Sequence, residues 1–416
     1  MSSGQARDLA ESNSQLGVQP SARPMKLFFI HEVDWLRKVV FEVHDFPELM
    51  SIRRHRVFVL DFPESGGSSW RAVVRSQQSR AWSGSRVQLI SSPVFLGPTL
   101  GRWLSTIWAL PSVINIVRRL KPDVIVSYAV PTFGWQALIA ARLLKIPLLY
   151  RAIDASSELR PGLHRRLVRC AEVAMCRFSD RISTHNAALR QRCIGSGANP
   201  EKVEILIPGV DLAHMCPGPP DEVLAQSIGI KTGDKILLFM GTLFGFAQLD
   251  HLIYQLLSVL RADPKLKLLI IGDGEAAHEL KELIERESIS GQVIMVGQIE
   301  YEHLPRYLRL GTVGLLPFAP AVISHNALPN KVLQYLACGL PSVSIRLDGL
   351  TSIVPDDAGV IYVENLSQLS LRAVSLIYDS DELTRQRNHA ITFSRGNLNW
   401  VEKITEFENM LISMLK

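Results

Sequence analysis

Short apolar runs alternate with longer periodic segments along most of this sequence, and the alternation occurs twice, on either side of a proline cluster at 217–220. Each run has the length of one buried strand, and the segments between the runs have the spacing of amphipathic helices. Strands that alternate with helices build parallel sheets covered on both faces. The sequence therefore predicts an α/β fold with two Rossmann-like, doubly wound domains.

The apolar runs and the proline and glycine residues between them set the expected boundaries of the strands, helices and domains. In the first series we expect strands at 26–30, 56–61, 87–90, 124–128, 148–151 and 203–206, and helices at 133–144 and 163–178. In the second we expect strands at 235–241, 266–271, 293–296, 313–316, 342–345 and 360–363, and helices at 249–261 and 275–287. Proline and glycine place a linker at 208–222. The expected domains are residues 25–210 and 220–385, and a helix at 386–416 could pack back on the first domain.

Composition excludes several classes of protein. Residues 1–24 are rich in Ser, Gln and Gly without an apolar run, which predicts a disordered tail and not a secretion signal. The five cysteines form no C-x-x-C pair, so neither a disulfide framework nor a zinc site is expected. A net charge of +5 is too small to indicate nucleic-acid binding. We therefore expect a cytoplasmic protein without a bound metal.

The segment at 103–117 comes nearest to a membrane-spanning helix, but it is too short and contains several polar residues. Its apolar residues recur at helical spacing and a basic cluster follows them: Trp103, Ile107, Leu110, Ile114 and Val117, then Arg118, Arg119 and Lys121. Such a helix can lie on the anionic inner face of a membrane, and it can equally be a core helix with a basic end. Pro111 weakens both interpretations.

Glycine-rich turns follow three strands of the second series. In chain order, these turns contain Gly241, Thr242, Gly245, Gly272, Gly297 and Gln298. Glycine lets a backbone approach a ligand closely, and a helix N-terminus after such a turn attracts phosphate. Ligands of parallel sheets bind at the carboxyl ends of the strands. The turns together predict a ligand site, although each one alone is also compatible with an ordinary strand-to-helix turn.

The segment LPNKVLQYLACGLP at 328–341 is the most informative in the chain. Pro329 or Asn330 starts a helix that Gly339 ends. Its first turn offers unpaired amides and about half a positive charge, and Lys331 adds a full charge there. A lysine in the first turn opposes the helix dipole, which favours a bound diphosphate over a purely structural helix. Gln334 lies one turn further on and could hydrogen-bond sugar hydroxyls.

These segments resemble glycosyltransferase family four, a group of retaining enzymes with the GT-B fold. PNKVLQYLACGLP resembles the Pro-Asn-Lys-x-x-Glu-Tyr motif of one subgroup, and GTLFGFAQLDHLI resembles that subgroup's glycine loop. The resemblance covers roughly residues 25–400. It implies two Rossmann-like domains facing a central cleft, with the acceptor on the first and a nucleoside-diphosphate sugar on the second. It also implies transfer with retention to a glycan or lipid-linked acceptor, without an obligatory metal or cofactor.

The sequence departs from the family where that family usually carries charge. Asn326 and Gln334 occupy the positions of two common glutamates, and Thr242 and Ala247 occupy those of a basic pair. Lys331 is then the principal cation for the diphosphate. Besides the glycine turns, the expected donor-binding residues are Asn326, Pro329, Asn330, Lys331 and Gln334.

Polar residues that follow the strands of the first domain are the acceptor candidates: His31, Glu32, Tyr128, Arg151 and Asp154. His31 is the only histidine directly after a strand expected in this domain. Asp154 either orients an acceptor hydroxyl or caps the segment that follows it. Together with Lys331, His31 and Asp154 are the expected catalytic residues.

Two other functions remain open. Gln334, Thr242 and Ala247 favour a catalytically impaired, transferase-like protein that serves as a binding or assembly partner. A nicotinamide-dependent enzyme is disfavoured, because the first strand is not followed by the G-x-G-x-x-G fingerprint.

Overall fold

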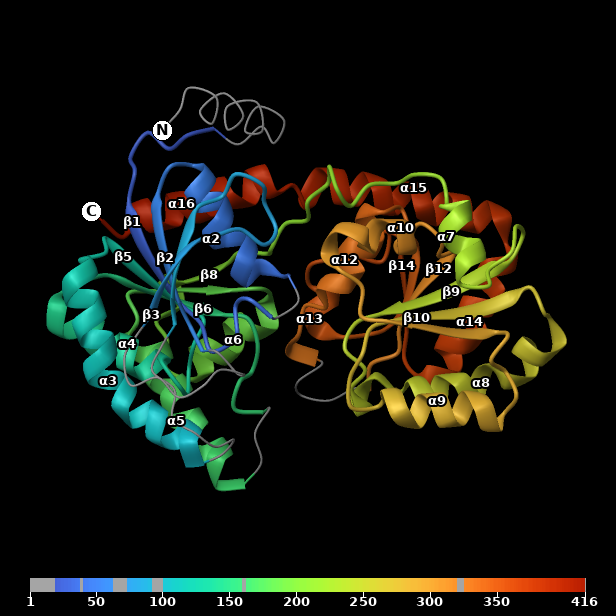
Figure 1. The fold of residues 1–416 in the computed structure, drawn as a ribbon, viewed down its shortest axis with the longest axis horizontal. Helices are drawn as coiled ribbons and strands as arrows, with labels where there is room; N and C mark the ends of the chain where they lie inside the picture. The colour runs from blue at the N-terminus through green and yellow to red at the C-terminus, as the bar shows by residue number, and fades with distance from the viewer. Residues whose placement is uncertain are drawn as a thin grey trace. The chain divides into compact units, whose positions relative to one another are not determined.

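The structure is a computed structural model that describes residues 19–37, 40–62, 73–91, 100–158, 162–319 and 325–415. The chain divides into two compact units (Figure 1). Unit 1 comprises Met1–Pro208 with Val401–Lys416, and unit 2 comprises Gly209–Trp400. Of the expected disordered tail, residues 1–18 lie outside the described part of the chain, and residues 19–24 form neither helix nor strand.

Unit 1 contains an eight-stranded sheet with the strand order β3-β4-β2-β1-β5-β6-β7-β8. Its strands are β1 (Lys26–Ile30), β2 (Arg56–Asp61), β3 (Val73–Gln78), β4 (Val87–Ser91), β5 (Val124–Ser127), β6 (Leu148–Ala152), β7 (Arg181–Thr184) and β8 (Val203–Ile205). Its helices are α2 (Glu42–Ile52), α3 (Leu100–Leu120), α4 (Gly134–Leu144), α5 (Gly162–Phe178), α6 (Ala187–Gly195) and α16 (Trp400–Ser413), with the short η1 (Pro200–Lys202). Neighbouring strands are parallel except β3 and β4.

Unit 2 contains a six-stranded, wholly parallel sheet with the order β11-β10-β9-β12-β13-β14. Its strands are β9 (Lys235–Met240), β10 (Leu266–Ile271), β11 (Val293–Gly297), β12 (Val313–Leu316), β13 (Ser342–Ile345) and β14 (Val360–Val363). Its helices are α7 (Glu222–Ser227), α8 (Leu249–Ala262), α9 (Ala277–Arg286), α10 (Leu304–Leu308), α12 (Asn330–Ala337), α13 (Asp348–Thr351), α14 (Leu366–Tyr378) and α15 (Ser380–Asn397), with η2 (Gly245–Ala247) and η3 (Tyr301–His303). The predicted α/β class and doubly wound, parallel arrangement are confirmed.

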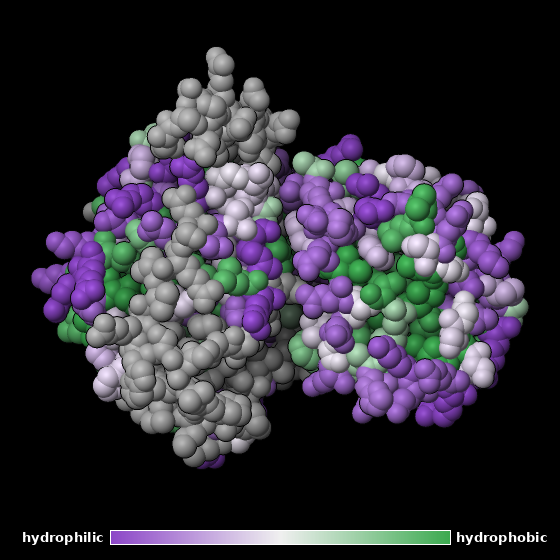
Figure 2. Space-filling model, in the orientation of Figure 1, coloured by the Kyte–Doolittle hydropathy of each residue, from purple (hydrophilic) through white to green (hydrophobic). Residues whose placement is uncertain are grey.

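Burial explains why the apolar runs were good predictors of strands. A parallel strand covered on both faces reads as a continuous apolar run, and in β10 the last four residues are buried. The helices carry the polar surface instead. Leu280, Leu283 and Ile284 form the buried side of α9, while Figure 2 shows hydrophilic residues along the outer side of this helix.

The expected linker at 208–222 packs on unit 2. The Arg309 Nε donates to the carbonyl of Cys216 at 2.9 Å, and the ring of His214 lies 2.9 Å from the carbonyl of Tyr301. Instead of one terminal helix at 386–416, the structure has α15 in unit 2 and α16, almost wholly in unit 1. Glu408 on α16 fixes that helix through an ion pair with Arg53 at 2.5 Å.

The segment suggested as a membrane helix is part of α3, which continues through Pro111. Ala109, Val113 and Val117 are buried in the core of unit 1, whereas the Trp108 side chain is 53% exposed. The side chains of Trp103 and Ile107 lie outside the described residues. These burials agree with a core helix that has a basic end. None of the described helices is long and apolar enough to cross a bilayer.

Candidate functional site

Three glycine turns meet at the carboxyl edge of the unit 2 sheet. The amide of Gly241, directly after β9, donates to the carbonyl of Ile271 at 2.9 Å. The amide of Gly272, directly after β10, donates to the carbonyl of Gly297 at 2.7 Å. Because β9, β10 and β11 are neighbours in the sheet, these hydrogen bonds join the predicted turns into one continuous backbone surface.

Two of these glycines are required by close contacts. Gly241 has φ 137°, and a Cβ there would lie 2.4 Å from the Lys331 Nζ. Gly272 has φ 136°, and its Cβ would lie 2.0 Å from the carbonyl oxygen of Gly241. Gly245 differs, since a Cβ there would meet nothing within 4 Å. The turn after β9 is therefore shaped to admit the ammonium group of Lys331.

Helix α12 begins where the sequence predicted, with Pro329 as its N-cap and no side-chain hydrogen bond at the cap. The first amides of a helix have no acceptor within the helix. The Oδ1 atom of Asn330 is buried and also has no hydrogen-bond partner in the described part of the chain. The Tyr335 hydroxyl accepts the amide of Met240 at 2.7 Å and so ties α12 to the end of β9.

Lys331 is held between two aromatic rings. Its Nζ lies 4.2 Å from the ring centroid of Phe239 and 4.5 Å from that of Phe318. Burial lowers the pKa of Lys331 to about 7. No carboxylate among the described residues forms an ion pair with it within 4.0 Å. A lysine in the first turn of a helix, with no ion-pair partner among the described residues, is suited to bind an anion with its protonated side chain.

The other expected donor residues surround this centre to different degrees. Thr242 and Gln298 are exposed on their turns, and Asn326 and Gln334 are half-buried before and within α12. Ala247 is completely buried and contributes no polar group. The sequence did not identify the aromatic partners Phe239 and Phe318. Phe239 lies in β9 and Phe318 lies just after β12. Only the order of the sheet shows that these two strands are neighbours, so the sequence alone could not show that both rings lie beside Lys331.

In unit 1, His31 lies in the interior. Its side chain is 0% exposed, its ring centroid lies 4.8 Å from that of Tyr128, and neither ring nitrogen has a hydrogen-bond partner among the described residues. Burial, with a smaller contribution from His44, lowers the pKa of His31 to about 3. The ring is therefore neutral at pH 7, and a role in proton transfer to a substrate would require it to be uncovered.

Arg151 also lies inside unit 1, in a charged cluster with Glu42 and His185. Its guanidinium contacts both Glu42 carboxylate oxygens, at 3.0 and 2.8 Å, and the ring of His185 lies 2.5 Å from the same carboxylate. Burial alone would raise the pKa of Glu42, but Arg151 and His185 outweigh it and lower that pKa to about 2. This cluster joins α2 to the ends of β6 and β7.

His185 corrects one sequence inference. It directly follows β7, a strand that the sequence did not reveal, so His31 is not the only histidine directly after a strand of this unit. Glu32 has a structural role as well. One of its carboxylate oxygens accepts the amides of Val130 at 2.8 Å and Thr132 at 2.6 Å, which fixes the turn before α4.

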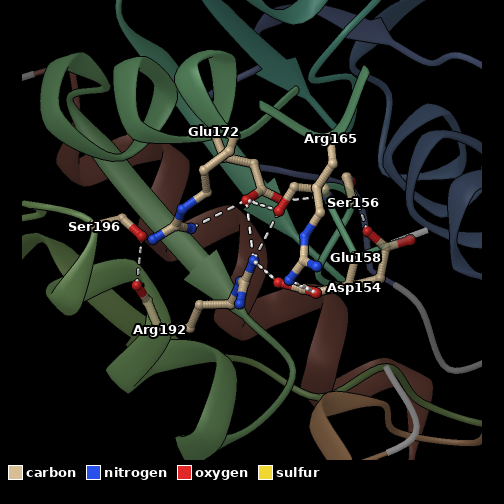
Figure 3. Close-up of polar contacts among 9 residues, drawn as sticks. Asp154, Ser156, Glu158, Arg165, Glu172, Arg192 and Ser196 are labelled. Atoms are coloured by element: carbon tan, nitrogen blue, oxygen red, sulfur yellow. Dashed lines mark hydrogen bonds and ion pairs between the residues drawn. The ribbon is translucent and has the colours of Figure 1, made fainter. Parts of the chain in front are cut away.

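Asp154 lies after β6, beside a network of charged side chains from α5 and α6 (Figure 3). Its carboxylate accepts a hydrogen bond from the Ser156 hydroxyl at 2.7 Å. At the centre of the network, Arg192 contacts Glu172 at 3.2 Å and Glu158 at 3.3 Å. Asp154 also lines a small cavity in unit 1, and neither His31 nor Arg151 lines that cavity.

Two family models of glycosyltransferases match this chain, one in each unit. Residues 48–209 match the family model "Glycosyl transferase 4-like domain", and residues 221–392 match "Glycosyl transferases group 1". The chain is 24% identical over 210 residues to D-inositol 3-phosphate glycosyltransferase from Segniliparus rotundus, covering 49% of this chain and 45% of that protein. It is 23% identical over 294 residues to α-monoglucosyldiacylglycerol synthase from Streptococcus pneumoniae, covering 65% of this chain and 63% of that protein. The chain thus spans about half the length of the first of these curated relatives.

A solved structure extends the likeness over nearly the whole fold. The structure of Anabaena Alr3699/HepE in complex with UDP and glucose superposes with a TM-score of 0.73 at 16% identity, covering 94% of this chain and 100% of that one. The two parallel α/β units therefore have the GT-B fold. Together with the two family matches, this fold supports a glycosyltransferase of the family-four type.

Proposed function

We propose that this chain transfers a sugar from a nucleoside-diphosphate sugar, held by unit 2, to a glycan or lipid-linked acceptor. The observation that carries the proposal is Lys331, in the first turn of α12, whose Nζ lies beside Gly241 and has no ion-pair partner among the described residues. A diphosphate there would pair with the ammonium and accept hydrogen bonds from the first amides of the helix. The UDP bound by the HepE structure supports this class of ligand.

The chemistry follows from the charge that develops on the donor. The bond from the anomeric carbon to the β-phosphate oxygen breaks, and its electron pair leaves on the diphosphate. The acceptor oxygen bonds to the anomeric carbon, and the acceptor proton passes to the released diphosphate. Lys331 and the α12 amides would stabilise the departing diphosphate, which is the charge that grows in the transition state. This cationic set is our reason for proposing no obligatory metal. Retention at the anomeric carbon is proposed from the family resemblance.

We propose that the acceptor binds unit 1 and is glycan or lipid-linked. The two relatives are named for inositol phosphate and for a diacylglycerol glycolipid, which supports a polyol or lipid-borne hydroxyl as the attacking group. The exposed Trp108, with exposed Arg118 and Arg119 on the same helix, would give a peripheral contact with the cytoplasmic face of an anionic membrane.

A catalytically impaired binding partner is the second candidate. The positions that usually hold two cations carry Thr242, which is exposed, and Ala247, which is completely buried. Neither can neutralise a diphosphate, so only Lys331 and the α12 amides would stabilise its negative charge. The number of cations is thus the observation that favours a binding role.

A turnover assay tests the proposal. The purified chain is incubated with a panel of nucleoside-diphosphate sugars, and release of the nucleoside diphosphate is measured with and without lipid or glycan acceptors. Loss of one preorganised charge-stabilising group typically lowers kcat about 10²–10³-fold, and we expect Lys331→Met to do so. Lys281→Met, an exposed substitution on α9, is the matched control. Wild-type binding of a donor without any turnover would favour the partner role.

A further inference from the structure

An aromatic row leads away from the Lys331 ammonium across the turn after β9. The row consists of Phe318, Phe246 and Phe244. The rings of Phe246 and Phe318 meet edge to face, with centroids 5.1 Å apart at an interplanar angle of 83°. The rings of Phe244 and Phe246 are stacked, with centroids 5.1 Å apart at 19°. The outermost ring, Phe244, is 42% exposed.

Backbone hydrogen bonds hold the row in place. The amide of Ala319 donates to the carbonyl of Phe246 at 2.8 Å, and the amide of Ala247 donates to the carbonyl of Phe244 at 3.0 Å. The amide of Leu243 donates to the carbonyl of Asp273 at 3.1 Å, which anchors the same turn on the loop after β10. A single exposed phenylalanine needs no function. The Phe244 ring differs because it is stacked on Phe246, which in turn contacts Phe318 beside the proposed diphosphate site.

The order of groups along a nucleoside-diphosphate sugar decides which part of it meets the row. The sugar is bonded to the β-phosphate, whereas the base is separated from that phosphate by the ribose and the α-phosphate. Phe318, the first ring of the row, already contacts the Lys331 Nζ at 4.5 Å from its centroid. With the β-phosphate bound by Lys331, the sugar is the apolar-faced group bonded to that phosphate and is the one placed to reach Phe246 and Phe244.

We infer that Phe244 and Phe246 form a stacking platform for the sugar ring of the donor, an inference that rests on the proposed function. The C–H face of a pyranose is apolar, and aromatic side chains pack against apolar ligand surfaces while polar groups at the rim fix the orientation. The platform would supply contacts to the sugar in a turn whose Thr242 and Ala247 supply no charge. It would make the chain favour nucleotide sugars over free nucleotides.

Calorimetric titration of paired ligands tests the inference. UDP is compared with UDP-glucose, and GDP with GDP-mannose, on wild type, Phe244→Ala, Phe244→Tyr and Tyr254→Ala. Tyr254 is 48% exposed on α8 and serves as the control aromatic residue. An aromatic contact contributes about 0.5–1.5 kcal/mol, so Phe244→Ala should lower the affinity for the nucleotide sugar about two- to tenfold. Free nucleotide affinity should stay within about twofold, and Phe244→Tyr should retain the wild-type preference.

The outcomes separate the two ideas. If wild type binds a nucleotide sugar and Phe244→Ala leaves its affinity unchanged, the platform is wrong while the proposed function stands. Equal weakening of the free nucleotide and the nucleotide sugar would also overturn the platform, because the contact would not be with the sugar. If wild type binds none of these ligands and no other nucleoside-diphosphate sugar of the turnover panel, the proposed function fails and the platform fails with it.

Discussion

Lys331 should take up a proton from solvent when a diphosphate binds next to it. Burial of its side chain between Phe239 and Phe318 lowers the pKa of Lys331 from 10.5 to about 7. An anion at contact distance stabilises the charged form and raises that pKa again. Binding of a nucleoside diphosphate should therefore be coupled to proton uptake above pH 7.

The size of the effect follows from the contact distance. At about 4 Å and an effective dielectric constant of about 20, two unit charges attract by about 4 kcal/mol, which corresponds to roughly three pKa units. The bound Lys331 would then titrate near pH ~10. At pH 8 the empty site carries about a tenth of a proton and the bound site nearly a whole one, an uptake of about 0.9 proton per nucleotide. At pH 6 the uptake at Lys331 falls to about 0.1.

Calorimetry measures this uptake directly. UDP is titrated at pH 6 and pH 8 in buffers of different ionisation enthalpy, and the dependence of the observed heat on the buffer gives the number of protons. Lys331→Arg is the control, since a guanidinium stays protonated throughout this range and any remaining uptake belongs to other groups. Equal uptake by wild type and Lys331→Arg at pH 8 would refute the reasoning.

Three further predictions follow from the same contacts. Between about pH 7 and 10.5, Lys331 is protonated in the unfolded chain but largely neutral in the folded, ligand-free protein, so it makes stability rise with pH over that window. Lys331→Met should therefore raise the free energy of unfolding by about 1–3 kcal/mol at pH 7 and by much less at pH 10.5. Denaturant titrations at both pH values check this. Gly241→Ala would place a methyl group 2.4 Å from the Lys331 Nζ and should weaken UDP binding at least about tenfold, whereas Gly291→Ala, whose Cβ meets nothing within 4 Å, should bind as wild type. Arg151→Met leaves the buried Glu42 carboxylate without its guanidinium and should cost about 3–5 kcal/mol of stability; adding Glu42→Gln should recover part of this loss, and additive losses on chemical denaturation would contradict the pairing.

The strands of both units were largely predictable because burial on two faces imposes continuous apolar runs. β1, β2, β10, β12, β13 and β14 have the bounds expected from the sequence. β7 was missed because it is only four residues long and two of them are the polar Ser183 and Thr184. β3 was missed as well; it pairs antiparallel with β4, outside the repeating parallel pattern.

The α2 helix shows why local patterns fail for buried charge. It contains Pro47, and its buried residues include Glu42 and Glu48, a composition typical of an exposed segment. The partner that permits burial of Glu42 is Arg151, which lies 109 positions away in the sequence. No local pattern can reveal such a pair.

The candidate site was predictable in part for a similar reason. The start of α12 and the glycine turns carry local signals, namely helix punctuation and glycine after a strand. The surroundings of Lys331 carry none, because Phe239 lies in β9 and Phe318 lies just after β12, and the adjacency of these two strands is set by the order of the sheet. His31 was singled out for its place after β1, but that position gave no sign of its complete burial.

A crystal structure of the full chain with UDP tests the central claim most directly. We expect diphosphate oxygens within about 3 Å of the Lys331 Nζ and of the Asn330 and Lys331 amides, next to the backbone of Gly241. A nucleotide bound elsewhere, with Lys331 still enclosed by its two rings and no anion at the start of α12, would contradict it.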